Sequence, residues 1–194
     1  SEMCIRDSFY GDRGDEIVDE SSPPGQGFLP EVCQAWEAAT APAQNRGSRT
    51  AHLRIGIVLT PNGGALQKML LPFKLGAGGI LGSGSQYMPW IAIDDVLNAM
   101  LHVLTNAQGT GPVNAVAPGV VTNRDFTKVL GRVLRRPTLI PTPGFVMRLV
   151  FGEMADALLL GGARVIPTRL SESAFEFGYP TLENALRHVL DRAT

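Results

Sequence analysis

The sequence predicts an α/β fold built on a parallel sheet. Its best strand, residues 51–59, is apolar apart from His52 and Arg54, as expected of a strand buried on both faces of a parallel sheet. Further predicted strands alternate with amphipathic helices along the chain, which is the pattern of parallel strands joined by helical crossovers. Residues 141–194 are mostly helical in pattern and indicate a smaller C-terminal unit.

The stretch from Gly82 to Leu104 is the first candidate for the lip of a site. It predicts a short strand, Trp90 to Ile93, that runs directly into an amphipathic helix with Asp94 as its N-cap. A glycine-rich loop, Gly76 to Gly84, precedes the strand, and open α/β sheets bind their ligands where strand ends meet such loops. The alternative is a buried strand and a capped helix with no ligand. The helix has six apolar residues at helical spacing, namely Val96, Leu97, Met100, Leu101, Val103 and Leu104.

The other predicted elements follow from local patterns. Those before the central stretch are a strand end at residues 9–12, a long polar loop at 11–27, a helix at 29–39, a loop at 44–49 and a helix at 65–75. Those after it are a strand at 113–117, a helix from Thr122 to Leu134, an edge strand at 139–140, helices from Thr142 and at 153–160, extended pieces at 164–166 and 175–177, and a final helix after Thr181. Thr122 and Asp125 form a capping-box pattern. The final helix has the apolar face Leu182, Ala185, Leu186, Val189 and Leu190.

Composition excludes several classes of protein. Hydrophobic residues make up 44% and charged residues 18%, which is ordinary for a globular chain. The formal net charge of −1 gives no support for a nucleic-acid partner or an anionic membrane surface. No apolar run reaches the ~18 residues of a membrane span, and we expect no signal peptide. Cys4 and Cys33 form neither a CxxC nor a metal motif, so we expect no metal site and a reduced, cytoplasmic compartment.

The sequence offers little self-contained catalytic chemistry. It has no GxSxG or HExxH motif. The run from Gly76 to Gly82 resembles a phosphate loop, but it lacks the preceding strand and following helix that place a pyrophosphate at a helix N-terminus. Asp94 and Asp95 are adjacent acids, yet neighbours at a helix start point in different directions, which favours capping over a carboxylate pair.

Several spaced features together resemble one family. They are Phe9-Tyr10-Gly11-Asp12, Trp36-Glu37, the strand Leu53 to Leu59, the pattern Gly-x-Gly-x-Gln-x-x-x-Trp-Ile-x-x-Asp-Asp from Gly82, GPVNAVAPGVVTNRDFT and RVIPTRLSESAFEFGYPTLENAL. They are similar to the atypical, epimerase-like branch of the extended short-chain dehydrogenase/reductase superfamily, over residues 9–192. The resemblance implies the second half of a Rossmann-type parallel sheet (9–140) followed by a small, mostly helical C-terminal domain (141–194). We therefore expect a C-terminal fragment whose residues 1–8 are a foreign or junction leader.

The resemblance also implies an activity and a set of site residues. It implies an NAD(P)-dependent epimerase or oxidoreductase acting on a small metabolite, with NADP (or NAD) bound by the full-length protein. The nicotinamide is expected against the backbone of Ile55, Gly56, Ile57 and Val58. The substrate side of the cleft is expected to be lined by Gln86, Tyr87 and Trp90. Tyr10 is the candidate catalytic acid, and its alternative role is packing under the sheet end.

The sequence also departs from the family pattern. The glycine loop that follows the family's first strand is missing, and the superfamily's Tyr-x-x-x-Lys dyad is absent from the segment Phe28–Cys33. Met88-Pro89 stand where sugar-nucleotide members place an Arg, and methionine cannot pair with phosphate. Arg54 can contact a ligand or, as is commoner for a buried charge, pair internally. The alternative function is therefore a cofactor-binding regulator or sensor with little or no catalysis, and the oligomeric state stays open.

Overall fold

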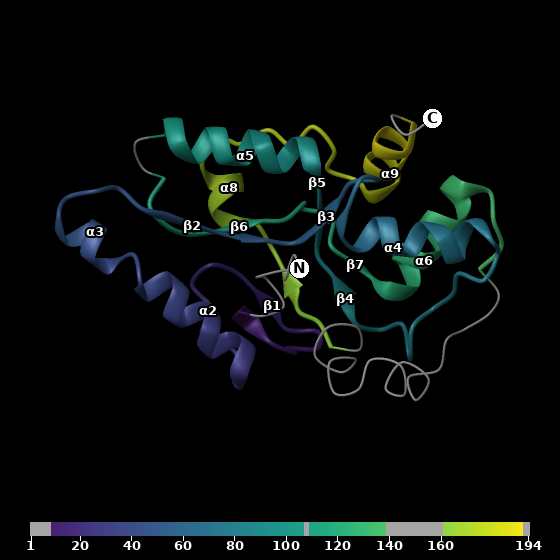
Figure 1. Cartoon of the computed structure of the whole chain (residues 1–194), viewed down its shortest axis with the longest axis horizontal. Coiled ribbons are helices and arrows are strands. Elements are labelled where there is room, and N and C mark those ends of the chain that lie inside the picture. The colour runs from purple at the N-terminus through teal and green to yellow at the C-terminus, as the bar shows by residue number, and fades with distance from the viewer. Residues whose placement is uncertain (1–8, 107–108, 139–160, 192–194) are drawn as a thin grey trace.

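The computed structural model describes residues 9–106, 109–138 and 161–191 and has the predicted α/β fold with parallel strands (Figure 1). Strand β2 (Ala51–Ile55) pairs in parallel with β6 (Gly111–Ala115), and β3 (Ile57–Leu59) pairs in parallel with β5 (Trp90–Ala92). Two smaller pairs are β1 (Ile17–Val18) with β8 (Arg164–Val165), which is parallel, and β4 (Tyr87–Met88) with β7 (Val121–Thr122), which is antiparallel.

Helices cover both faces of the β2–β6 pair. Alternation along β2 sends Leu53 toward α5 (Ile93–Thr105) and α8 (Thr168–Glu172), whereas Arg54 faces α2 (Phe28–Ala38). Figure 1 shows α5 and α8 on one side of this pair and α2 on the other. The remaining helices are α3 (Ala41–Asn45), α4 (Gly64–Lys74), α6 (Asn123–Leu134) and α9 (Leu182–Asp191).

The predicted single strand at residues 51–59 is two strands that meet at Gly56. The Gly56 N–H donates to the carbonyl of Ala115 in β6, and the next N–H, that of Ile57, donates to the carbonyl of Pro89 just before β5. The chain therefore changes its neighbour within one residue. A Cβ at position 56 would lie 2.8 Å from the Pro89 oxygen and 2.9 Å from a Val116 methyl, so only glycine fits this crossing.

The predicted N-cap of α5 is wrong. The helix begins at Ile93, its N-cap is Ala92, and no side chain caps it. Asp94 instead lies in the first turn, where its Oδ2 contacts His188 Nε2 on α9 at 2.9 Å. The buried Asp95 accepts hydrogen bonds from the backbone N–H groups of Gly178 (2.8 Å) and Tyr179 (3.0 Å). Both carboxylates therefore bond to the C-terminal segment and do not cap the helix.

The predicted apolar stripe of α5 is only partly buried. Val96 and Val103 lie in the core together with Ala99, whereas Leu97 and Leu101 are more than half exposed. A wide stripe in the sequence therefore overstates the width of the face that packs on the sheet.

Other local predictions have mixed outcomes. Thr122 is confirmed as the N-cap of α6, since its Oγ1 accepts from the Asp125 N–H at 3.2 Å, and the same hydroxyl donates to the Asp125 carboxylate at 2.7 Å. Phe9 and Tyr10 have helical backbone rather than that of a strand end, and α3 includes Gln44, which was expected in a loop. The expected strand at 139–140 and helices from Thr142 and at 153–160 lie outside the described residues. No described helix is long and apolar enough to cross a membrane.

The final helix contributes to the main core. Leu182, Ala185, Leu186 and Val189 are buried in one cluster with residues of β3, β5, α4 and α6. Residues 182–189 therefore share a core with the sheet. The domain boundary near residue 140 stays a prediction, since residues 139–160 are not described.

Replacing Leu186 by Asp should abolish folding of the segment that contains α9. Leu186 is fully buried, so the change removes a contact worth roughly 2–5 kcal/mol and buries an unpaired charge, against a total stability of about 5–15 kcal/mol. Urea denaturation followed by circular dichroism measures the loss. The control is Asn184→Asp on the exposed side of the same helix. An unchanged midpoint for Leu186→Asp would show that α9 is merely tethered.

Candidate functional site

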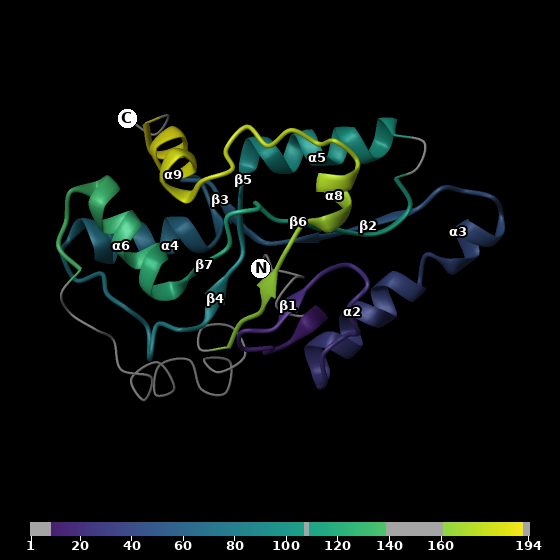
Figure 2. The ribbon, with the colours of Figure 1, turned by 180° about the vertical axis from the view of Figure 1, so that it is seen from behind.

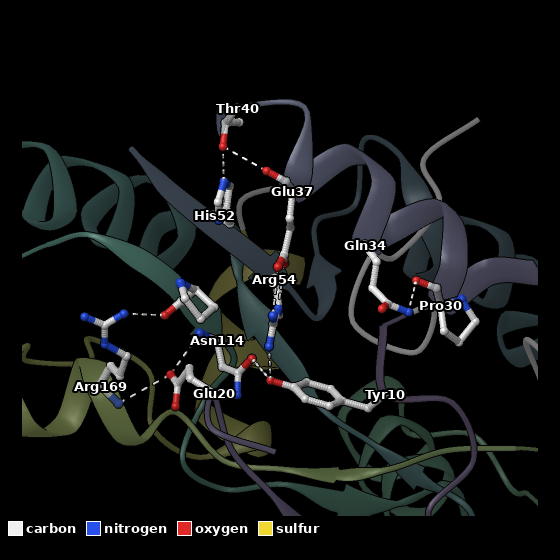
Figure 3. A network of polar contacts seen from close by, with 11 residues as sticks. Tyr10, Glu20, Pro30, Gln34, Glu37, Thr40, His52, Arg54, Asn114 and Arg169 are labelled. Carbon is white, nitrogen blue, oxygen red and sulfur yellow. Dashed lines mark hydrogen bonds and ion pairs between the residues drawn. The ribbon is translucent and has the colours of Figure 1, made fainter. Parts of the chain in front are cut away.

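A buried polar network centres on the hydroxyl group of Tyr10 (Figure 3). The fully buried Tyr10 donates to Asn114 Oδ1 at 2.9 Å and accepts from Arg54 Nη1 at 2.8 Å. Burial raises the pKa of the Tyr10 phenol, while the neighbouring Arg54 guanidinium acts in the opposite direction. The Tyr10 proton is therefore committed to Asn114 in this arrangement.

Arg54 is paired internally, as expected for a charge in a buried strand. Its Nε and Nη2 donate to the two carboxylate oxygens of Glu37 on α2, at 2.8 and 2.9 Å. The guanidinium carbon also lies 3.3 Å from the centre of the Phe9 ring. Strand β2 is thereby fixed to helix α2 through a bidentate ion pair.

In the part of the chain that the structure describes, the outer edge of β6 is bonded by side chains and not by another strand. Glu20 Oε1 accepts from the Asn114 N–H at 2.9 Å and from the Arg169 N–H at 3.3 Å. The Arg169 guanidinium donates to the carbonyls of Thr110 and Pro112, the latter at 2.8 Å. These contacts satisfy backbone groups of β6 that an open sheet edge would leave unpaired. Among the described residues, the buried Oε2 of Glu20 has no hydrogen-bond partner.

The residues expected to meet a nicotinamide lie at the Gly56 crossing. Ile55 ends β2, and Gly56 and Ile57 donate their N–H groups to the carbonyls of Ala115 and Pro89, as described above. Gly56 and Ile57 are buried, whereas Ile55 and Val58 are partly exposed. Glycine is therefore required at position 56 because the Pro89 backbone and the Val116 side chain pack directly against it.

The residues expected on the substrate side are brought together only in part. Gln86 donates to the Leu81 carbonyl at 3.1 Å, and the half-buried Tyr87 has the Arg164 guanidinium 5.7 Å from its ring centre. Trp90 lies in register with Ile57, next to the expected nicotinamide residues. Its side chain is fully buried and donates to the Gly119 carbonyl at 2.9 Å, which is a packing contact.

The glycine-rich loop at residues 76–84 follows helix α4 and leads to strand β4, so it lacks the strand–loop–helix context of a phosphate loop. Its backbone is bonded within the protein. Leu81 N donates to Asn123 Oδ1 at 2.9 Å, and Arg124 N donates to the Gly84 carbonyl at 3.0 Å. The loop thus rests on the start of α6.

An open hollow of about 310 Å³ was not predicted from the sequence. It lies between the segment after β6 and the β8–α8 junction and is lined by Pro118, Ile166, Pro167, Thr168, Ser171 and Glu172. Its volume is at the lower end of the range of small-molecule sites. Within the described part of the chain, the buried Thr168 Oγ1 makes no hydrogen bond. Only the fold places residue 118 beside residues 166–172, because no sequence motif links them.

The parallel sheet, its helical layers and its strand-end loops define a Rossmann-type α/β protein. The structure of the human epimerase family protein SDR39U1 (isoform 2), described as being with NADPH, superposes with a TM-score of 0.87 and 36% identity, over 95% of this chain and 62% of that chain. A UDP-glucose 4-epimerase of Thermotoga maritima shares the fold with a TM-score of 0.73 at 16% identity, over 97% of this chain and 62% of that chain.

Sequence relatives agree with the structural ones. An epimerase family protein of Mycobacterium bovis is 42% identical over 184 residues, and human SDR39U1 is 40% identical over 173 residues. Residues 142–189 match a domain of unknown function (DUF1731). In sequence and fold the chain is similar to the atypical, epimerase-like branch of the extended short-chain dehydrogenase/reductases. The alignment with the M. bovis relative spans 95% of this chain and 61% of that protein. The alignment with the human protein spans 89% of this chain and 59% of that protein.

Glu20 should make the stability of the protein fall as pH rises. Burial raises the pKa of the Glu20 carboxyl, although the Asn114 and Arg169 N–H groups act in the opposite direction. In the window just above the ordinary carboxyl pKa, the folded state then binds more protons than the unfolded state, so stability decreases with increasing pH. Each unit of upward shift corresponds to about 1.4 kcal/mol.

In the variant Glu20→Gln the side chain cannot ionise, so the contribution of residue 20 to the pH dependence of stability should be absent. Urea unfolding at about pH 5 and about pH 8 should show the variant gaining stability relative to the natural chain at the higher pH. Glu16→Gln, on an exposed neighbour, is the matched control. Equal pH dependence in the natural chain and Glu20→Gln would contradict the prediction.

Proposed function

We propose that the chain is part of an NAD(P)-dependent epimerase or oxidoreductase that acts on a small metabolite. The observation that supports this best is the likeness, at 36% identity and a TM-score of 0.87, to a human family member whose structure includes NADPH. The segment 53–59, which carries the expected nicotinamide contacts, includes the end of β2 and all of β3, and each of these strands pairs in parallel with a different neighbour. NADP, or NAD, is the cofactor we propose for the full-length protein.

The proposed roles keep the residues expected from the sequence. Ile55 and Val58 offer partly exposed surface to the nicotinamide end, and Gln86 and Tyr87 offer partly exposed side chains to the substrate. We propose that Trp90 supports this wall from behind, because its side chain is fully buried. Division of the chain near residue 140 into a cofactor domain and a substrate-side domain belongs to the same proposal.

A second candidate function is a cofactor-binding regulator with little or no catalysis. The geometry of Tyr10 favours it, because a general acid must reach the substrate and the Tyr10 hydroxyl is buried between Arg54 and Asn114. The segment Phe28–Cys33 has no Tyr-x-x-x-Lys pair to replace it. The packing role that was the alternative for Tyr10 therefore has the better support.

The variant Tyr10→Phe separates the two roles of Tyr10. In a packing role, loss of the hydroxyl removes the hydrogen bonds that Tyr10 makes to Arg54 Nη1 and Asn114 Oδ1 and should lower the free energy of unfolding by about 1–3 kcal/mol. In a catalytic role, kcat of the full-length protein with a turned-over substrate should fall by about 10²–10⁴. The control is Tyr179→Phe, which removes a hydroxyl from a tyrosine whose ring stacks on His188. We expect the loss of stability, and an unchanged urea midpoint would contradict it.

The 194-residue chain alone should bind NADPH weakly. A Rossmann domain holds the pyrophosphate at the glycine turn and helix N-terminus of its first half, whereas the glycine run at 76–82 of this chain lies between α4 and β4 and not between a strand and a helix. Three charge-assisted hydrogen bonds at roughly 1.5–3 kcal/mol each amount to about 4–9 kcal/mol, or some three to six decades of affinity. Nicotinamide fluorescence measures binding to this chain and to a version extended upstream to the length of its relatives.

We expect low-micromolar or tighter binding for the extended protein and no saturation for the shorter chain. A low-micromolar dissociation constant for the shorter chain would show that the pyrophosphate is held by residues already present, such as the loop at 76–84. Absence of binding by the extended protein would contradict the proposed function itself.

A further inference from the structure

One helix carries an unusual line of positive charge. Arg124, Lys128, Arg132 and Arg135 follow one another along α6 and its C-cap at intervals of four, four and three residues, and all four are exposed. Such intervals place side chains on one helix face. We call this set the α6 basic stripe. Its first and last Cα atoms are about 16 Å apart at 1.5 Å per residue.

The opposite face of α6 is buried. Phe126, Thr127 and Leu130 lie in the core, and α6 packs against α9 and α4. Figures 1 and 2 show these three helices grouped at one end of the molecule. The helix is therefore anchored by its apolar face and presents the basic stripe as a fixed array.

The basic stripe is not explained by helix stability. Arg132 and Arg135 complement the negative end of the helix dipole, but Arg124 lies in the first turn, where a cation is unfavourable. Arg124 and Lys128, like Lys128 and Arg132, are like charges four residues apart, which destabilises a helix. Arg135 also has φ of +54°, a left-handed conformation that favours glycine.

Nearby acids neutralise the basic stripe only partly. The sole acid within Asn123–Leu134 is Asp125, which bonds to the Thr122 hydroxyl. Glu183 on α9 pairs with Arg132 at 2.9 Å but also with Arg187 at 2.7 Å, so one carboxylate serves two guanidinium groups. Since the whole chain has a net charge of −1, this local excess of positive charge is a segregated surface.

We propose that the α6 basic stripe is a docking surface for an acidic segment of a partner protein. Arginine, three of the four cations, matches planar carboxylates with two parallel hydrogen bonds. Carboxylates spaced one helical turn apart, or on alternate residues of an extended strand, reach successive cations of such a stripe. One member of the stripe, Arg124, also donates to the Ser83 carbonyl at 2.8 Å, so its guanidinium is partly engaged within the protein.

Two other anionic partners fit less well. Single-stranded nucleic acid is bound without sequence preference through aromatic stacking as well as charge, and no exposed aromatic residue is found on the described residues of α4, α6 or α9. A helix that binds a bilayer through its surface has exposed apolar residues beside its cations, and the four positions of the basic stripe are all cationic. Exposed Leu71 and Leu75 on the neighbouring α4 make anionic lipid the alternative that the experiment must separate.

Fluorescence anisotropy with a labelled ten-residue glutamate peptide tests the proposal. The variant is Lys128→Glu/Arg135→Glu, and the matched control is Arg46→Glu/Lys68→Glu, which makes the same change in net charge at exposed cations elsewhere. We expect binding that weakens with salt, a loss of affinity of about tenfold or more in the variant, and a change of less than about twofold in the control. Thermal melting checks that both proteins are folded.

Three outcomes would overturn the proposal. The first is no binding of the peptide at low salt, and the second is equal weakening by the two double variants, which would show a response to net charge alone. The third is tighter binding of a single-stranded thymidine oligonucleotide, or of phosphatidylserine vesicles, that is lost in the Lys128→Glu/Arg135→Glu variant.

Discussion

The arrangement of the sheet depends on two consecutive backbone hydrogen bonds. The N–H of Gly56 bonds to β6, and the N–H of Ile57 bonds to the residue before β5. Strands that run side by side up to Gly56 therefore separate, and β5 enters between β3 and the end of β6, where Ala117 N donates to the Trp90 carbonyl at 2.7 Å. Because a side chain at position 56 would collide with Pro89 and Val116, glycine is a condition for this insertion.

The insertion of β5 determines how the C-terminal segment is attached. β5 leads without a loop into α5, so Asp94 and Asp95 in the first helical turn are delivered to the end of the sheet. There they hold His188 on α9 and the backbone of residues 178–179. A buried carboxylate is tolerated only when it is hydrogen-bonded, and Asp95 meets that condition through two N–H groups. The same turn that starts a helix therefore fastens residues nearly a hundred positions later in the chain.

The sequence predicts those features of the fold that depend on near neighbours. The N-cap of α6 and its partner Asp125 lie within four residues, and the apolar run at 51–59 is recognisable from its composition. The break at Gly56 was missed because one long buried strand and two short ones give the same apolar run. The role of Asp95 was missed because its hydrogen-bond partners are more than 80 residues away. Periodicity showed that α5 is amphipathic, but it did not show that Leu97 and Leu101 remain exposed.

The candidate site shows the same division between near and distant neighbours. Internal pairing of Arg54 could be predicted from the cost of a lone buried charge, whereas the partnership of Tyr10 with Asn114, 104 residues apart, has no signal in one sequence. Stability alone does not require this network, because buried ion pairs are often no more stabilising than apolar packing of similar volume. The network instead fixes how these elements are oriented, because the hydrogen bonds of Arg54, Tyr10 and Asn114 link α2, β2 and β6 with defined geometry. Strand β2, which ends at the proposed nicotinamide contact Ile55, is thus tied to both α2 and β6, and such support keeps the residues of a binding site in place.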